Sequence, residues 1–320
     1  DSREKERMRG MTYRYHPELQ ELVDDPAGFP PAEKFVGTLE EMRAFADPLY
    51  AEMRDLPLAE GVVARDVEIE TADGYPMRAR WYRKEGSDAR SAVMYVHGGG
   101  MILMGIDEMD ADISRYVALS GVPFLSIGYR LAPEHPRPQA EDALAGYLWL
   151  IGHADELGID AHRVAIMGDS GGAGIAAGAA ILARDRGVPL AKQILIYPML
   201  DDRTVACDDE LDGLAHVWFA ENNKMAWEAV LGERRGTDEV LPCEAPARNE
   251  SFEGLAPAFL EVGELDLFRD ETIEYAKRLM AAHVPAELHV LTGLTHTFDT
   301  FPLPIADKAF EYRSYVISQL

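Results

Sequence analysis

The sequence predicts an α/β domain with a mainly parallel sheet, and two patterns support this prediction. From about residue 62 to the C-terminus, short runs rich in β-branched and aromatic residues alternate with longer segments of helical periodicity. Such alternation is typical of strands that are joined by crossover helices. No helical pattern separates the first two runs, so we expect them to form an antiparallel hairpin that turns at Ala72-Asp73-Gly74.

The individual elements follow from these periodicities in chain order, and together they predict an eight-stranded sheet flanked by helices. The expected strands cover residues 62–70, 77–83, 91–96, 123–127, 163–167, 193–197, 258–262 and 287–291. The expected helices cover residues 108–120, 139–153, 172–186, 271–283 and 305–320. We assign residues 59–320 to this domain.

The composition limits the class of partner. Apolar residues make up 47% of the chain and charged residues 27%, which is ordinary for a globular protein with a packed core. The 31 Lys and Arg against 56 Asp and Glu give a formal net charge of −25. A chain this acidic repels nucleic-acid phosphates and anionic lipid headgroups. We therefore expect a small-molecule ligand, with neither a nucleic acid nor a membrane as partner.

Cysteine usage and the chain's apolar runs indicate the compartment. Cys207 and Cys243 form no C-x-x-C pair and no cluster with metal-ligand spacing, a pattern that favours a reducing compartment and no metal site. The first ten residues are charged and lack the apolar core of a secretory signal. The longest run of small or apolar residues, 171–183, is shorter than the roughly 20 residues that span a bilayer. The expectation is a soluble, cytoplasmic protein.

Residues 1–58 precede the alternation and are expected to form a helical cap region. Thr38 and Glu41 have the spacing of a capping box. The pair Asp47-Pro48 is typical of an N-cap followed by proline at the first helical position, so two short helices are predicted. Their apolar stripe consists of Phe35, Leu39, Met42, Phe45, Leu49 and Met53.

A second segment, about residues 201–245, also interrupts the alternation. Its amphipathic part contains the apolar residues Val217, Trp218, Phe219, Met225 and Trp227. We interpret both segments as a lid over the sheet, with Met42, Met101, Trp218 and Phe219 lining a substrate pocket. Ordinary packing of these side chains against the body of the domain is the alternative.

The strongest chemical signal is Gly168-Asp169-Ser170-Gly171-Gly172, between a predicted strand and a Gly/Ala-rich helix. A serine in such a sharp turn projects its hydroxyl away from the backbone, and the helix N-terminus favours a nearby oxyanion. A dinucleotide-binding loop starting at Gly172 is disfavoured, because Gly172 lies several residues past the strand end and no acidic residue ends a second strand about 20 residues on. Ser170 is thus the candidate nucleophile.

The second signal is His97-Gly98-Gly99-Gly100, directly after the strand at 91–96. Consecutive glycines have a high backbone entropy cost, which is explained if their amides must approach a developing negative charge. His97 lies ahead of the glycines, at the end of the strand. We therefore expect it to anchor the loop rather than to act as a base.

The third signal is a pair of loops after the last two strands. Asp266 follows the strand at 258–262, with Glu264 and Asp270 as close rivals, and His296 follows the strand at 287–291. In open α/β sheets, active and ligand-binding sites lie at the carboxyl ends of the strands. The chain order of serine, aspartate and histidine is the order of the α/β-hydrolase triad.

These motifs together resemble the hormone-sensitive-lipase-like (bacterial family IV) carboxylesterases of the α/β-hydrolase superfamily. The resemblance runs from about residue 60 to the end and also includes Tyr129-Arg130-Leu131-Ala132-Pro133-Glu134, Tyr197-Pro198-Met199-Leu200-Asp201 and Asp266-Leu267-Phe268-Arg269-Asp270-Glu271. It implies that the N-terminal helices belong to a cap and that a homodimer forms. This chain has Gly171 where the family usually has alanine, Leu267 in place of a usual proline, and Thr297 in place of a usual glycine.

The resemblance further implies that Gly98, Gly99 and Gly171 supply the oxyanion-hole amides and that Asp266 is the triad acid. The expected activity is hydrolysis of short- to medium-chain acyl esters through Ser170, His296 and Asp266, without a metal or organic cofactor. An amidase or arylformamidase shares this nucleophile, and some relatives of the family are non-catalytic small-molecule receptors that have lost the histidine. Both stay as alternatives, although His296 is present here.

Overall fold

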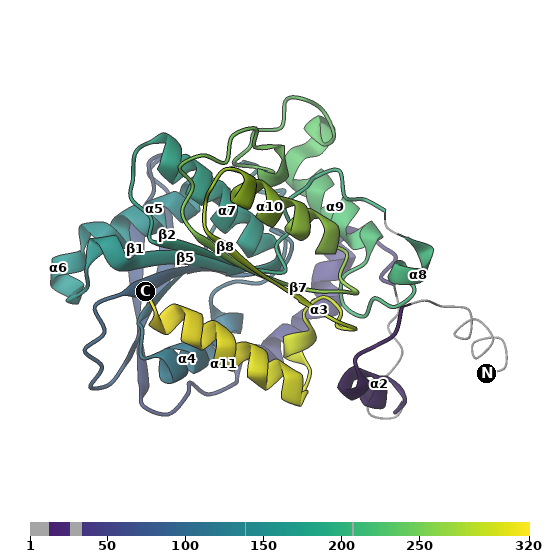
Figure 1. Ribbon diagram of the computed structural model, residues 1–320, viewed down its shortest axis with the longest axis horizontal. Coiled ribbons are helices and arrows are strands. Elements are labelled where there is room, and N and C mark those ends of the chain that lie inside the picture. The colour runs from purple at the N-terminus through teal and green to yellow at the C-terminus, as the bar shows by residue number, and fades with distance from the viewer. Residues whose placement is uncertain (1–12, 26–33, 138, 207) are drawn as a thin grey trace.

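The computed structural model describes residues 13–25, 34–137, 139–206 and 208–320, and they form the eight-stranded, mainly parallel sheet that was predicted (Figure 1). The strand order is β1-β2-β4-β3-β5-β6-β7-β8. The bounds are β1 Val62–Glu70, β2 Pro76–Lys84, β3 Ala92–Val96, β4 Phe124–Ile127, β5 Val164–Asp169, β6 Lys192–Ile196, β7 Ala258–Gly263 and β8 Ala286–Leu291. Each expected strand is present, with ends that differ by at most two residues.

Strand direction follows from how the strands are connected. The predicted hairpin is confirmed, because β1 and β2 pair antiparallel from Val62 opposite Lys84 to Glu70 opposite Pro76. Gly74, in the turn, has a φ of +82°, a conformation that glycine adopts without steric cost. Strand β2 is also antiparallel to β4. The pairs from β4 through β8 are parallel, so the carboxyl ends of these strands meet at one edge.

Helices cover both faces of the sheet (Figure 1), with α5, α7 and α10 on one side and α4 and α11 on the other. The α-helices are α2 Pro17–Val23, α3 Leu39–Arg54, α4 Asp110–Ser120, α5 Gln139–Gly152, α6 Ala154–Leu157, α7 Ser170–Asp185, α8 Asp209–Asp212, α9 Ala220–Leu231, α10 Arg269–Ala281 and α11 Pro304–Ser318. The 3-10 turns are η1 Asp107–Met109, η2 Ala161–Arg163, η3 Gly232–Arg234, η4 Pro246–Arg248 and η5 Phe298–Thr300. The five predicted helices are all present.

The prediction of two short helices around Asp47-Pro48 is wrong. A single helix, α3, runs from Leu39 to Arg54 with Pro48 inside it, and the predicted capping box of Thr38 and Glu41 opens it. Proline removes one helical hydrogen bond. Pro48 and Ala44, whose carbonyl loses that bond, are both on the exposed side of α3, so the carbonyl is left on the solvent side of the helix rather than in the core.

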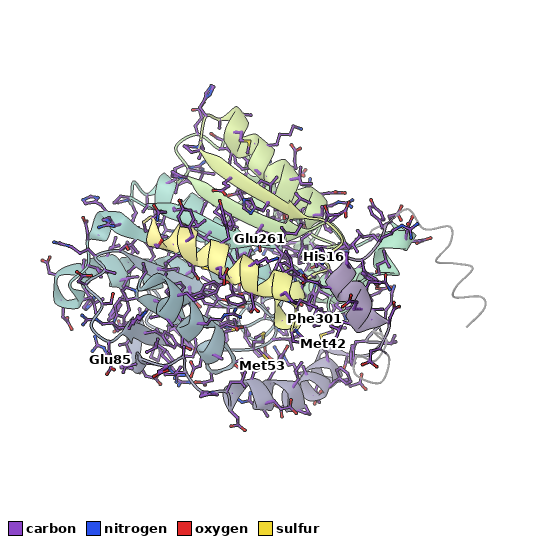
Figure 2. All side chains as sticks on the ribbon, turned by 60° about the horizontal axis from the view of Figure 1, so that its bottom comes forward. His16, Met42, Met53, Glu85, Glu261 and Phe301 are labelled. Carbon is purple, nitrogen blue, oxygen red and sulfur yellow. The ribbon has the colours of Figure 1, made fainter. Side chains whose placement is uncertain are left out.

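The apolar stripe expected on α3 is also only partly correct. Met42 is buried in the main core, and Figure 2 shows Met42 and Met53 on the side of α3 that faces the body. Phe45 and Leu49 are instead exposed, at 75% and 60%. They lie on the side of α3 opposite Arg43, whose guanidinium faces the body and donates to the Ile102 and Ala132 carbonyls.

The segment at 201–245 contributes α8 and α9 above the carboxyl edge of the sheet (Figure 1). Trp218, Phe219 and Trp227 are buried, as their apolar character predicts, whereas Val217 is 45% exposed. Within the described residues, no helix is long and apolar enough to cross a membrane. Cys243 is half-buried with a free thiol, and Cys207 lies outside the described residues.

Candidate active site

The turn from β5 into α7 holds Ser170 in a strained conformation. Ser170 is the first residue of α7 and has a φ of +53°, which is rarely adopted by residues other than glycine. Its neighbours must be small, because a Cβ on Gly172 would collide with the backbone carbonyls of Val96 and His97, and one on Gly168 with the backbone of Gly172. This close packing turns the Ser170 hydroxyl away from the strand, as expected of a nucleophile elbow.

Ser170, His296 and Asp266 form a continuous hydrogen-bonded chain at the carboxyl edge of the sheet. The Ser170 Oγ lies 2.9 Å from His296 Nε2, and His296 Nδ1 lies 2.7 Å from Asp266 Oδ2. All three side chains are buried, with 5%, 4% and 0% of their surface exposed. The other oxygen of Asp266 accepts the backbone N–H of Phe268 at 2.8 Å. This arrangement can transfer a proton from the hydroxyl to the imidazole.

The two alternative candidates for the triad acid make other interactions. Glu264 accepts the backbone N–H of Gly293 at 2.9 Å, and Asp270 pairs with Arg269 at 2.7 Å. Glu264 nevertheless contributes to the geometry of the site, because it ties its own loop to the loop of His296. A second bond, from the Leu265 N–H to the Leu294 carbonyl at 2.9 Å, holds these two loops together.

The glycine loop after β3 lies against the nucleophile turn. Gly99, Gly100 and the following Met101 have φ values of +94°, +59° and +66°. These left-handed residues curl the backbone back over α7. A Cβ on Gly98 would strike the Asp169 carboxylate, which shows how closely the loop approaches the turn. Gly98, Gly99 and Gly171, the predicted oxyanion glycines, therefore lie together beside Ser170.

His97 lies behind this loop, apart from the chain of Ser170, His296 and Asp266. Its ring is fully buried, stacks on Tyr129 with ring centres 4.3 Å apart, and places Nδ1 2.9 Å from the Gly98 carbonyl. Burial lowers the pKa of His97 to about 4, so the ring is neutral at pH 7. The Tyr129 hydroxyl donates to the carbonyls of His97 and Gly98. Both side chains brace the loop.

The four residues predicted to line a pocket occupy two places. Met42, Met101 and Trp218 belong to one hydrophobic cluster, and the Trp218 ring packs on Gly100 of the glycine loop. Phe219 is buried at the start of α9, where the Lys34 ammonium lies 5.7 Å from its ring centre. Met101, which directly follows the glycine loop, and Trp218 therefore lie at the loop, whereas Met42 is buried in the main core.

Sequence reasoning missed a buried polar network behind His296. Arg313, on α11, is 1% exposed and pairs with Glu261 and Asp299. Asp299 accepts the Tyr197 hydroxyl at 3.0 Å, and the Tyr197 ring meets the His296 ring edge-on, with centres 4.8 Å apart. The available signal was a lone arginine at an otherwise apolar position of the last helical pattern.

Asp169, next to the nucleophile, has an altered acidity. It accepts a hydrogen bond from the Tyr95 hydroxyl. Burial raises the pKa of Asp169 to about 6, with smaller contributions from the charges of Asp299 and Asp112. No group of three or more His, Cys, Asp or Glu among the described residues could hold a metal ion.

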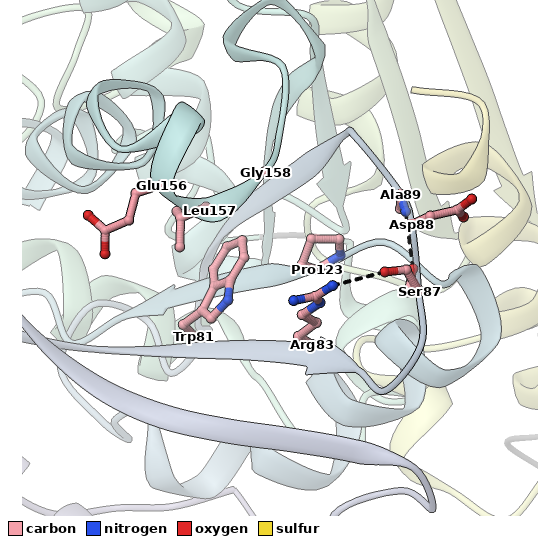
Figure 3. Close-up of a pocket in the computed structure, with 9 residues that line it drawn as sticks. All are labelled: Trp81, Arg83, Ser87, Asp88, Ala89, Pro123, Glu156, Leu157 and Gly158. Atoms are coloured by element: carbon pink, nitrogen blue, oxygen red, sulfur yellow. Dashed lines mark hydrogen bonds between the residues drawn. The ribbon is translucent and has the colours of Figure 1, made fainter.

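The pocket drawn in Figure 3 is a separate feature. It has a volume of about 230 Å³ and is lined by Trp81, Arg83, Ser87, Asp88, Ala89, Pro123, Glu156, Leu157 and Gly158. Ala89 and Pro123 precede β3 and β4, so the pocket lies at the amino edge of the sheet. Ser170, by contrast, lies at the carboxyl edge.

Comparison with known proteins agrees with the geometry. Residues 93–300 match the alpha/beta hydrolase fold family. The chain is 32% identical over 240 residues to the ethyl acetate hydrolase of Pseudomonas putida, which covers 73% of this chain and 74% of that protein. It is 32% identical over 300 residues to the carboxylesterase NlhH of Mycobacterium tuberculosis, covering 92% and 91%. A solved structure of a bacterial heroin esterase superposes with a TM-score of 0.85 at 31% identity, over 95% of this chain and 97% of that one.

Proposed function

The chain belongs to the hormone-sensitive-lipase-like branch of the α/β-hydrolase family, and on this premise we propose that it is a serine carboxylesterase for short- to medium-chain acyl esters. The observation that carries the proposal is the hydrogen-bonded chain from Ser170 through His296 to Asp266. The names of the similar proteins, an ethyl acetate hydrolase and a carboxylesterase, support the ester as substrate class.

The reaction begins when Ser170 Oγ attacks the ester carbonyl carbon. His296 Nε2, 2.9 Å away, accepts the hydroxyl proton, and Asp266 holds the imidazole by its Nδ1 and stabilises the imidazolium that forms. Asp266 is itself kept in place by the Phe268 N–H. The buried setting of these side chains strengthens each of these interactions.

The tetrahedral intermediate places its oxyanion toward the amides of Gly98, Gly99 and Gly171. The N-terminus of α7 adds partial positive charge at the same point. His296 then gives its proton to the departing alcohol, which leaves an acyl-enzyme on Ser170. A water molecule that loses its proton to the same imidazole attacks the acyl group and releases the acid.

The surroundings favour a small apolar acyl group. Ser170 and His296 are 5% and 4% exposed, so little of either side chain is open to a bulky substrate. Met101 and Trp218, which lie at the glycine loop, offer an apolar surface, and α3 and α9 form the cap above it. The net charge of −25 disfavours anionic esters relative to neutral or cationic ones.

The test is hydrolysis of p-nitrophenyl esters from acetate to laurate by the native protein and by Ser170→Ala. Ser251→Ala, at an exposed position, is the matched control. We expect turnover of the short esters to be lost in Ser170→Ala and kept in Ser251→Ala, with unchanged circular dichroism. Turnover by a folded Ser170→Ala variant, or an inactive native protein, would overturn the proposal. Faster turnover of a matched amide than of the ester would point to an amidase.

A further inference from the structure

The indole of Trp218 lies directly on the backbone of Gly100. A Cβ built on Gly100 would come within 2.5 Å of the Trp218 Cη2 and 2.8 Å of its Cζ2. The ring is 8% exposed and comes from the segment just before α9, more than one hundred residues after the loop that it covers. Gly100 must therefore be glycine because Trp218, from the segment at 201–245, leaves no room for a Cβ.

Gly100 is held from its other side by the nucleophile turn. A Cβ on Gly171 would lie 2.9 Å from the Gly100 Cα and 2.9 Å from the Met101 backbone nitrogen. The glycine loop is thus confined between the indole of Trp218 and the backbone of Gly171. The indole and the nucleophile turn thus contact the loop that carries the predicted oxyanion amides from two sides.

A buried asparagine fixes the indole. The Nε1–H of Trp218 donates to the Oδ1 of Asn223 at 3.1 Å, and Asn223 is completely buried. Its amide nitrogen donates in turn to the Thr204 carbonyl at 2.6 Å. Asn223 thus uses both ends of its side chain, one on the indole and the other on the loop after β6.

That loop leads back to the nucleophile. The Thr204 hydroxyl donates to Glu271 at 2.5 Å, and Glu271 also accepts the backbone N–H of Leu200 at 2.5 Å. The N–H of Met199, the next residue back, donates to the Ser170 carbonyl at 3.0 Å. Trp218 is therefore tied through Asn223 to the same framework that holds Ser170.

From these contacts we propose that Asn223 is a positioning residue for the oxyanion hole and acts through Trp218. The inference rests on the proposed esterase function. Oxyanion donors must lie about 2.7–3.1 Å from the charge that develops in the transition state, and loss of one donor lowers kcat about 10²–10³-fold. An indole released from Asn223 lets the loop move by a fraction of this distance. The expected result is a decrease in kcat that is smaller than the decrease on loss of a whole donor.

The experiment compares Asn223→Ala with Asn222→Ala. Asn222 is the neighbouring buried asparagine, and its Oδ1 accepts the Phe219 N–H at the start of α9 rather than the indole. It therefore controls for general damage to α9. The measured quantities are kcat and KM for p-nitrophenyl acetate, and the Ki of a trifluoromethyl ketone, whose adduct with Ser170 carries an oxyanion.

For Asn223→Ala we expect kcat to fall roughly tenfold with KM nearly unchanged, and the ketone to bind about tenfold more weakly, because only transition-state contacts are lost. Asn222→Ala should move neither value by more than about twofold. In the Trp218→Phe background, which already lacks the indole N–H, Asn223→Ala should have little further effect. Trp218→Phe alone provides the same test if Asn223→Ala does not fold.

Three outcomes would overturn the inference: an unchanged kcat in folded Asn223→Ala, an equal loss in both backgrounds, or an unchanged Ki for the ketone. Each of these leaves the native protein active and Ser170 essential. Failure of this inference is therefore distinct from failure of the esterase proposal, in which the native protein itself does not turn over the ester.

Discussion

Arg313 and Glu261 form an ion pair that is buried beneath the loop of His296. Each is 1% exposed, and the Arg313 Nε donates to Glu261 Oε1 at 2.9 Å. The guanidinium also pairs with Asp299, which accepts a hydrogen bond from the Tyr197 hydroxyl. Through this network α11 and β7 support the Tyr197 ring, which packs edge-on against the His296 imidazole.

Arg313→Met should therefore destabilise the protein strongly. Removal of the guanidinium leaves two buried carboxylates without a counter-charge, and breaking such a pair typically costs about 3–5 kcal/mol. Urea unfolding at pH 7.5 measures this loss. Lys277→Met is the control, since Lys277 and its partner Glu274 are exposed and such pairs contribute at most about 1 kcal/mol. Equal decreases in the free energy of unfolding of the two variants would show that burial does not make the Arg313 ion pairs more important for stability than an exposed pair.

Asp266→Asn should lower kcat by about 10⁴-fold while the fold is kept, because the amide no longer holds the required tautomer of His296. The measurement is kcat for p-nitrophenyl acetate, with circular dichroism to confirm folding. Asp270→Asn is the matched control, since Asp270 pairs with Arg269 at the surface, and it should stay near the native rate. A large loss in Asp270→Asn with activity retained in Asp266→Asn would mean that Asp270, and not Asp266, is the triad acid.

Gly171→Ala should harm both stability and turnover. The added methyl would lie 2.9 Å from backbone atoms of Gly100 and Met101, and overpacking of this kind costs about 1–3 kcal/mol. We expect kcat to fall more than KM rises, because the displaced atoms belong to the glycine loop. Gly152→Ala is the control, since nothing lies within 4 Å of a Cβ at that position. A Gly171→Ala variant with native stability and kcat contradicts the close approach.

The stability of Glu271→Gln should differ from that of the native protein in a way that depends on pH. Burial raises the pKa of Glu271 from its ordinary 4.5 to about 8. Between these values the folded protein keeps a proton that the unfolded chain has released. The native free energy of unfolding therefore falls as pH rises through this window, by up to about 1.4 kcal/mol per pH unit, and is level above it.

Glutamine does not titrate, so the stability of Glu271→Gln minus that of the native protein should increase from pH 5.5 to 8 and then stay constant. Urea unfolding at pH 5.5, 7, 8 and 9 measures this difference. Glu274→Gln, at an exposed position of the same helix, should show no such slope. A difference for Glu271→Gln that is the same at every pH would mean that the carboxyl is already ionised in the folded protein.

The strands and the three site loops were predictable because local signals specify them. The run 164–167 is apolar and buried along its whole length, and the glycines after it admit only a sharp turn. Asp266 and His296 follow two further strands, and parallel pairing of β7 with β8 brings their ends together. The structure confirmed the fold class and the strands, and the similar proteins support ester hydrolysis.

The failures concern contacts that no local pattern records. Phe45 and Leu49 are exposed because of the orientation of α3. Arg43 helps to fix that orientation by donating to the carbonyls of Ile102 and Ala132, which are distant in the sequence. Pro48 inside α3 shows tertiary packing overriding a helix-breaking residue. The bond from Trp218 to Asn223 joins residues only five apart, yet its importance depends on the distant Gly100, so the spacing alone could not reveal it.

The left-handed backbone conformation of Ser170 lowers the stability of the protein at the residue whose hydroxyl turnover requires. Ser170→Gly and Ser170→Ala both lack the hydroxyl, but only glycine adopts this φ without steric cost. We expect the glycine variant to be more stable than the alanine variant by about 0.5–1 kcal/mol, despite its larger unfolded-state entropy. Thermal unfolding of the two inactive variants measures this difference, and equal melting temperatures would contradict it. Folding alone favours glycine here, so the protein keeps its reactive hydroxyl in a conformation that lowers its own resistance to heat.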